Sequence, residues 1–244
     1  LAKPAEATSI IAFKATELLY QAGVPKDVLQ FVPSEGRLFG EVILSNDAIS
    51  GVAFTGSTAT AHVINRALAS RDSSIAKLIA ETGGQNSMII DSSALLEQAS
   101  DDIINSSFIS AGQRCSALRV LYVQSDVADS LIDLLKGAMS ELEVGDPTLF
   151  KTDIGPVINK ASQDSLNQHI EAISKEAKFI AKVKINSTKF GFFVEPHLFE
   201  INNMNQLDSE NFGPILHLVR YKAKDLDKVI DEINSSGYGL TFGI

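Results

Sequence analysis

The feature that most constrains the fold is a regular alternation of short apolar segments with longer segments of helical periodicity. The apolar segments have strand length and are predicted at residues 28–32, 51–56, 75–81, 86–91, 118–124 and 214–221. The helical segments are predicted at residues 5–23, 57–70, 93–112, 127–142, 163–178 and 225–236. Strands that alternate with helices pair in parallel, and short apolar strands are typical of sheets covered on both faces. The pattern therefore predicts an α/β fold with mainly parallel sheets.

The sharpest break in this pattern is the segment ETGGQN at residues 81–86, which connects the predicted strand at 75–81 to the predicted strand at 86–91. Two adjacent glycines allow the backbone to take conformations that other residues avoid, so the chain can change direction there. We therefore predict two units, the first over residues 1–82 and the second over residues 83–244.

Composition and charge exclude several classes of function. The chain has 244 residues, of which 45% are hydrophobic, and its net charge is −9. An acidic surface disfavours binding to nucleic acid and to anionic membranes, and no segment approaches the roughly 20 apolar residues of a membrane span. A single cysteine excludes an internal disulfide and fits a reducing, cytoplasmic setting.

The two ends of the sequence indicate a piece of a longer protein. The chain begins at Leu1 without a methionine or a signal-peptide pattern. It finishes on GYGLTFGI at residues 237–244, which is typical of the middle of a strand. We expect the parent protein to continue beyond this sequence.

The segment FTGST, around Gly56 and Ser57, joins a predicted strand to a predicted helix. A glycine followed by a hydroxyl residue at a helix start directs backbone N–H groups toward an anion, which is typically a phosphate. The same residues also fit an ordinary turn with a capped helix. The segment KPAE places Lys3 and Glu6 at the start of the first predicted helix, where they either bind ribose hydroxyls or form a solvated charge pair.

Two further residues have the chemistry of catalytic groups. Glu81 ends an apolar strand before two glycines, and a carboxylate in an apolar setting can act as a general base. The alternative is a glutamate at a strand end in water. Cys115 lies in the polar segment AGQRCSALR between a predicted helix and a predicted strand, where catalytic loops tend to lie. A lone cysteine is otherwise a small packing residue.

Together these motifs resemble the aldehyde dehydrogenase superfamily. The order KPAE, FTGST, E-x-G-G, G-Q-x-C and E-x-F-G-P (ENFGP at residues 210–214) is similar to the motif order of that family over the whole chain. The segments at residues 81–98 and 110–124 resemble in particular the Δ1-pyrroline-5-carboxylate dehydrogenase module of bacterial proline utilization A. Gln85 points to the same branch, because many aldehyde dehydrogenases have lysine at that place.

This resemblance implies the C-terminal part of a Rossmann-type NAD-binding domain in residues 1–82 and most of an α/β catalytic domain in residues 83–244. It assigns NAD as the cofactor, since a carboxylate near the ribose repels the 2′-phosphate of NADP. The residues that it assigns to NAD are Lys3 and Glu6 (adenosine ribose), Gly56 and Ser57 (pyrophosphate), Gly83 (the loop beside the nicotinamide), Glu210 (nicotinamide ribose) and Phe212 (nicotinamide ring).

The same resemblance implies oxidation of L-glutamate γ-semialdehyde to L-glutamate in proline catabolism. Cys115 is then the nucleophile, Glu81 the general base that activates water, and Ser116 a contact of the substrate carboxylate. The implied partner is a small-molecule substrate, no metal is expected, and FAD is implied only in a proline dehydrogenase domain of the parent protein. The full-length protein is expected to be a homo-oligomer.

The pattern also departs from the family. The asparagine of the family's oxyanion hole and the loop that anchors the substrate carboxylate fall outside this sequence, so we expect little turnover by the chain alone. Another aldehyde substrate and a non-catalytic relic of the fold remain open. A thiol hydrolase would need a base such as histidine beside the cysteine, and the four histidines show no such motif spacing: His62, His169, His197 and His217.

Overall fold

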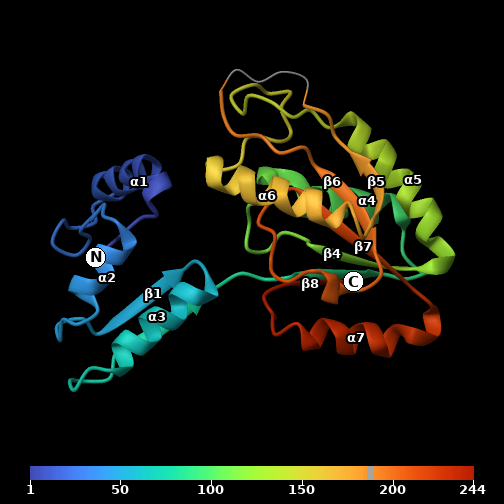
Figure 1. Cartoon of the computed structure of the whole chain (residues 1–244). Helices are drawn as coiled ribbons and strands as arrows, with labels where there is room; N and C mark the ends of the chain where they lie inside the picture. The colour runs from blue at the N-terminus through green and yellow to red at the C-terminus, as the bar shows by residue number, and fades with distance from the viewer. Residues whose placement is uncertain (186–189) are drawn as a thin grey trace. The chain divides into compact units, whose positions relative to one another are not determined.

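The described part of the chain contains two sheets with mainly parallel strands, one in each of two compact units (Figure 1). The units are Leu1–Thr82 and Gly83–Ile244, and each is described by itself. The computed structural model describes residues 1–185 and 190–244. Among these residues, no helix has the length and apolar character that crossing a membrane requires.

The first unit contains a two-stranded parallel sheet with helices around it. Its small core is formed by Leu44, Ile64 and Leu68. In the sheet, Thr55 lies opposite Glu81, so both strands end at the same edge. The elements of this unit are η1 (Glu6–Thr8), α1 (Ser9–Gln21), α2 (Gly36–Ile43), β1 (Gly51–Thr55), α3 (Thr58–Ala69) and β2 (Lys77–Glu81).

Two features of the first unit differ from the sequence-based prediction. The predicted strand at 28–32 is wrong, because this segment forms only a single bridge between Phe31 and Ala2. The following Pro33 has no N–H group with which to extend the pairing. The short helix α2 was not predicted, because its eight residues give the periodicity only two turns in which to appear.

The second unit is built on a six-stranded sheet in the order β5-β6-β7-β4-β3-β8. All neighbouring strands in it are parallel except the pair β5 and β6. This confirms the predicted α/β fold with mainly parallel sheets. The strands are β3 (Ser87–Ile90), β4 (Val120–Gln124), β5 (Lys178–Lys182), β6 (His197–Ile201), β7 (Ile215–Tyr221) and β8 (Phe242–Gly243).

The central strand β4 is buried along its whole length, as its apolar sequence predicts, and it lies between β3 and β7. The amphipathic helix α5 packs its apolar residues, among them Leu131 and Leu135, into the same core. The helices are α4 (Leu96–Phe108), η2 (Ile109–Gly112), α5 (Ser125–Glu141), α6 (Lys160–Ile173), η3 (Met204–Gln206), η4 (Ala223–Asp225) and α7 (Leu226–Ser235).

The predicted helix at 93–112 is too long, because α4 ends at Phe108 and the chain then kinks through η2. The predicted helix at 163–178 also extends too far, since its last residue already belongs to β5. The strands β5 and β6 were not predicted. The end of the sequence pairs with the sheet as the short strand β8 beside β3.

Candidate active site

The loop that carries Cys115 connects η2 to β4, and Cys115 is exposed in it. Three successive residues before the loop have positive φ angles: 59° at Ser110, 54° at Ala111 and 64° at Gly112. A Cβ atom at Gly112 would overlap the backbone carbonyl oxygen of Gly213. A glycine is therefore required there by both backbone conformation and space. The tight turn brings the cysteine loop against the loop that precedes β7.

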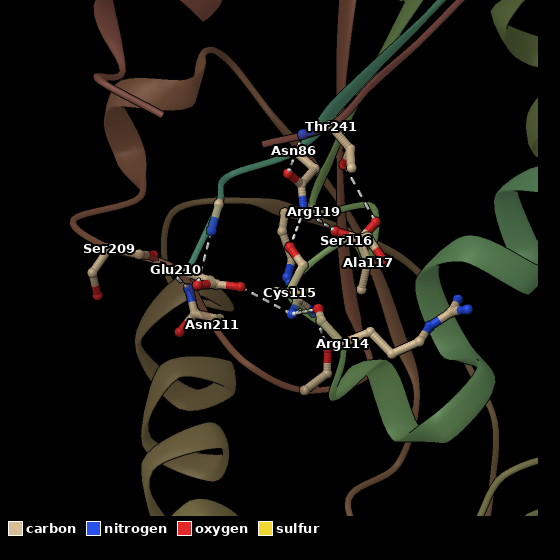
Figure 2. Close-up of polar contacts among 12 residues, drawn as sticks. Asn86, Arg114, Cys115, Ser116, Ala117, Arg119, Ser209, Glu210, Asn211 and Thr241 are labelled. Atoms are coloured by element: carbon tan, nitrogen blue, oxygen red, sulfur yellow. Dashed lines mark hydrogen bonds and ion pairs between the residues drawn. The ribbon is translucent and has the colours of Figure 1, made fainter. Parts of the chain in front are cut away.

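One buried cation, Arg119, joins these two loops (Figure 2). Its side chain is 3% exposed and donates hydrogen bonds to the backbone oxygens of Gly213 and Arg114, both at 3.1 Å. It also pairs with the Glu210 carboxylate at 3.2 Å, and its guanidinium lies 5.2 Å from the ring centroid of Phe212. Burial lowers the pKa of Arg119, while the charge of Glu210 opposes this shift.

The Glu210 carboxylate is held at both of its oxygens. Oε1 accepts from Arg119, and Oε2 accepts the backbone N–H of Gly84 at 3.1 Å. A Cβ atom at Gly83 would overlap Oε2, so the two glycines allow the chain to pass directly beside the carboxylate. Within the second unit, the structure thus brings Gly83, Glu210 and Phe212 together, and Arg119 connects them to the loop of Cys115. Gly83, Glu210, Phe212 and Cys115 are four of the residues that were singled out from the sequence.

Ser116 is exposed beside Cys115, and its backbone oxygen accepts a hydrogen bond from the Thr241 hydroxyl at 3.4 Å. In residues 1–185 and 190–244, no group accepts a hydrogen bond from the backbone N–H of Cys115 or Ser116. Two donors beside the thiol are therefore available to a bound oxygen.

In the first unit, Glu6 accepts the backbone N–H of Gly36 at 2.6 Å and lies 3.6 Å from the ammonium group of Lys3. Backbone hydrogen bonds, and to a smaller extent Lys3, lower the pKa of Glu6 below its usual value. Lys3 itself donates to the backbone oxygens of Pro4 and Ser34. The predicted pair therefore exists, and Glu6 is held as an ionised acceptor.

The turn after β1 differs in one respect from the predicted phosphate site. The backbone N–H of Gly56 donates to the backbone oxygen of Glu81 at 3.0 Å, so it continues the sheet and is not free to bind an anion. Ser57 caps α3, since its hydroxyl accepts the backbone N–H of Thr60 at 3.2 Å. A phosphate at this turn would have to use the other N–H groups of the first turn of α3.

The side chain of Glu81 is exposed at the end of β2. Of the two alternatives for Glu81, the first unit by itself shows the carboxylate at a strand end in water, and its role as a general base stays a prediction. The site also contains residues that the sequence analysis did not single out, chiefly Asn86 and Arg119. The available signal was a polar or charged residue directly before an apolar strand, a place where it must be buried and hydrogen-bonded.

Comparison with known proteins matches residues 1–244 to the aldehyde dehydrogenase family. The chain is 46% identical to the bifunctional protein PutA of Klebsiella aerogenes, and the match covers 100% of this chain and 19% of PutA. It is 33% identical to the 1-pyrroline-5-carboxylate dehydrogenase of Geobacillus sp. (strain WCH70), with 99% of this chain and 47% of that protein covered.

Among solved structures, a variant of proline utilization A from Bradyrhizobium japonicum is similar, with a TM-score of 0.94 at 48% sequence identity. That match covers 99% of this chain and 24% of the solved one. The chain thus spans about a fifth of the bifunctional relatives' length and about half of the shorter dehydrogenase's length. Since the family match extends over every residue, the chain belongs to the aldehyde dehydrogenase family.

Proposed function

We propose that this chain is part of an NAD-dependent dehydrogenase that oxidises L-glutamate γ-semialdehyde to L-glutamate. The observation that carries the proposal is the link from the loop of the exposed Cys115, through buried Arg119, to the loop of Glu210 and Phe212. Its relatives of similar sequence are named bifunctional protein PutA and 1-pyrroline-5-carboxylate dehydrogenase, which supports this aldehyde over others.

The proposed reaction begins at Cys115. Its thiolate sulfur attacks the aldehyde carbon, a carbon–sulfur bond forms, and the carbonyl oxygen becomes an oxyanion. The free backbone N–H groups of Cys115 and Ser116 can stabilise that charge. Once the carbon has lost its hydride, it remains attached to Cys115 as a thioester. Water then adds to the thioester carbon, the carbon–sulfur bond breaks, and the acid leaves as the thiolate is regenerated.

Glu81 is the carboxylate that we assign to the hydrolysis step. An ionised carboxylate can accept a proton from the attacking water, and its exposed side chain is accessible to that water. A thioester is hydrolysed slowly without such a base, whereas transfer to phosphate or to a thiol does not require it. Glu81 therefore favours an enzyme that releases a free acid.

The residues present fit NAD. The Glu210 carboxylate is oriented by Arg119 and Gly84 and retains lone pairs that can accept ribose hydroxyls. In the first unit, the ionised Glu6 beside Lys3 is suited to a second ribose, and α3 begins with Ser57 where a pyrophosphate would bind. When bound, NAD supplies the acceptor for the hydride.

The proposal is tested with the longer protein that contains this chain. Cys115→Ala should abolish oxidation of glutamate γ-semialdehyde, and Glu81→Gln should slow the release of product more than the formation of NADH. A panel of aldehydes tests the substrate, and a simple apolar aldehyde with the higher kcat/KM would refute the assignment. Full activity of Cys115→Ala would refute the reaction class. The 244-residue chain alone is expected to show little turnover beside the longer protein, and equal turnover would contradict that expectation.

A further inference from the structure

The inference concerns Asn86, the last residue of the segment GGQN, which directly precedes β3. Its side chain is buried, with 4% of the residue exposed. The amide nitrogen donates to the backbone oxygen of Cys115 at 2.7 Å and to that of Ala117 at 2.8 Å (Figure 2). The amide oxygen accepts the backbone N–H of Thr241 at 3.2 Å. Both donors of this side chain therefore go to the loop that carries the cysteine.

The backbone of Asn86 binds the same segment a little further along. Its carbonyl oxygen accepts the N–H groups of Arg119 at 3.0 Å and of Val120 at 3.1 Å, where β4 begins. The stretch from Cys115 to Val120 is thus held by four hydrogen bonds to one residue. A buried asparagine with both N–H groups used fixes the orientation of the peptides that it contacts.

The direction of these bonds matters for the chemistry beside the thiol. A trans peptide places its carbonyl oxygen and its N–H on opposite sides. Because the Cys115 oxygen points toward Asn86, the N–H of Ser116 in the same peptide points away from Asn86. That N–H is one of the two donors that bond to no other group in the described part of the chain. Asn86 therefore determines where a free donor next to the nucleophile is aimed.

We propose that Asn86 is a positioning residue for the nucleophile loop, which holds Cys115 and orients the neighbouring N–H through its two amide donors. The proposal rests on the proposed role of Cys115. It predicts that loss of the two donors, and not of the amide oxygen, is what releases the loop.

Asn86→Asp separates these two functions. Aspartate keeps the shape and the acceptor for Thr241, but when ionised it donates no hydrogen bond to the oxygens of Cys115 and Ala117. Asn86→Ser is a second variant, smaller and with one donor, and it should have an intermediate effect. Gln124→Ala is the matched control. Gln124 is also a buried amide, at the opposite end of β4, and within the described residues its side chain bonds to Ser92 and Asp126 and not to the cysteine loop.

The first measurement is hydrogen exchange by mass spectrometry on the 244-residue chain, together with the rate of Cys115 alkylation by iodoacetamide. The site of alkylation is unambiguous because the chain has one cysteine. We expect Asn86→Asp to raise exchange at least tenfold at Gln113, Ala117 and Leu118, whose backbone N–H groups are hydrogen-bonded in the folded loop, and to change the alkylation rate and its pH dependence. Gln124→Ala should change neither. Exchange and alkylation at wild-type values in Asn86→Asp would overturn the proposal, as would an equal effect of Gln124→Ala.

The second measurement separates this proposal from the proposed function. In the longer protein, Asn86→Asp should lower kcat at least tenfold while the Kd for NAD changes less than threefold. A fall in NAD affinity that accounts for the whole loss of activity would overturn the positioning role. If the loop loosens in Asn86→Asp but Cys115→Ala still oxidises aldehyde, the proposed function fails and the structural role of Asn86 stands.

Discussion

The positive φ angle of Gly112, before the cysteine loop, and the helical position of Gly137 predict opposite effects for two Gly→Ala substitutions. At Gly112, alanine would hold a left-handed conformation, at about 1–2 kcal/mol, and its Cβ would overlap the Gly213 oxygen, which adds about 1–3 kcal/mol of overpacking. Alanine also lowers the conformational entropy of the unfolded chain, which offsets about 0.4–1 kcal/mol of this destabilisation. Gly112→Ala should therefore destabilise the second unit by about 1–4.6 kcal/mol. At Gly137, toward the C-terminal end of α5, no atom of the described residues beyond the chain neighbours and the helix's own backbone lies within 4 Å of the position that a Cβ would take, and alanine should stabilise by about 0.5–1 kcal/mol.

Ser110→Gly is the reverse substitution in the same turn. Ser110 is exposed with a φ of 59°, so glycine relieves about 1–2 kcal/mol of strain and costs about 0.4–1 kcal/mol in unfolded-chain entropy. Its net effect should be a stabilisation of about 0.8 kcal/mol. Urea unfolding gives the values, and hydrogen exchange of the β4 amides reports the second unit separately from the first. A stabilised Gly112→Ala, or a Ser110→Gly variant destabilised by about 1 kcal/mol or more, would refute the reasoning.

Three further substitutions test the packing and electrostatics of the two units. Arg119→Met leaves the Glu210 carboxylate without its cation and should cost about 3–5 kcal/mol in urea unfolding, with less than about 1 kcal/mol contradicting the role of the pair. Ser57→Ala removes the cap of α3 and should cost about 1 kcal/mol, seen as faster exchange of that helix's first-turn amides and contradicted by unchanged exchange. Burial lowers the pKa of His217 to about 3, and its Nε2 lies 3.0 Å from Nε2 of His169. Between about pH 6.5 and pH 3, His217 is therefore protonated in the unfolded chain and neutral in the folded chain. Stability should therefore fall as the pH is lowered from about 6.5 to 3, by up to about 1.4 kcal/mol per pH unit, and His217→Gln should flatten this slope unless the reasoning is wrong.

The parallel sheet of the second unit could be predicted because its central strands carry a clear signal. The segments that became β3, β4 and β7 are mostly apolar, and most of their residues are buried because both faces of each strand are covered. The strands β5 and β6 lack this signal. β5 is a short edge strand with a lysine at each end and a bulge, and β6 includes Glu200, which is stabilised by pairing with Arg220. Pairing partners far along the chain, and not local sequence, make these segments strands.

Some residues of the candidate site could likewise be predicted from the sequence, and others could not. Cys115 could be singled out because a cysteine in a polar loop between a helix and a strand has few structural uses, whereas Glu210 and Phe212 were singled out only by the resemblance of the segment ENFGP to a family motif. Asn86 and Arg119 were not singled out, because the only local signal is a polar residue directly before an apolar strand, and their roles depend on partners about 30 residues away for Asn86 and about 90 for Arg119. The hydrogen bond of the Gly56 N–H could not be predicted either, because its acceptor is the backbone oxygen of Glu81 in β2, 25 residues away.

The position of the cysteine loop on the sheet explains why polar and cationic side chains hold it. Asn86, Arg119 and Gly213 directly precede or lie close before β3, β4 and β7, which run parallel, so the loop lies at the amino end of these strands. Ligands of open parallel sheets usually bind at the opposite, carboxyl end, where helix N-termini supply positive charge. The loop of Cys115 instead follows the C-terminal end of α4, which carries partial negative charge.

Two arginines offset that negative charge. Arg114 donates to the backbone oxygens of Asn105 and Ser106 in the last turn of α4, and Arg119 donates to the backbone oxygen of Arg114 itself. The charge of Cys115, when ionised, in turn favours the charged form of Arg119. A negative charge that forms at this loop is thus stabilised by side chains and free backbone N–H groups, and not by a helix N-terminus. For this reason the side chains that hold the loop, foremost Asn86 and Arg119, should affect the reactivity of the thiol as strongly as its immediate neighbours do.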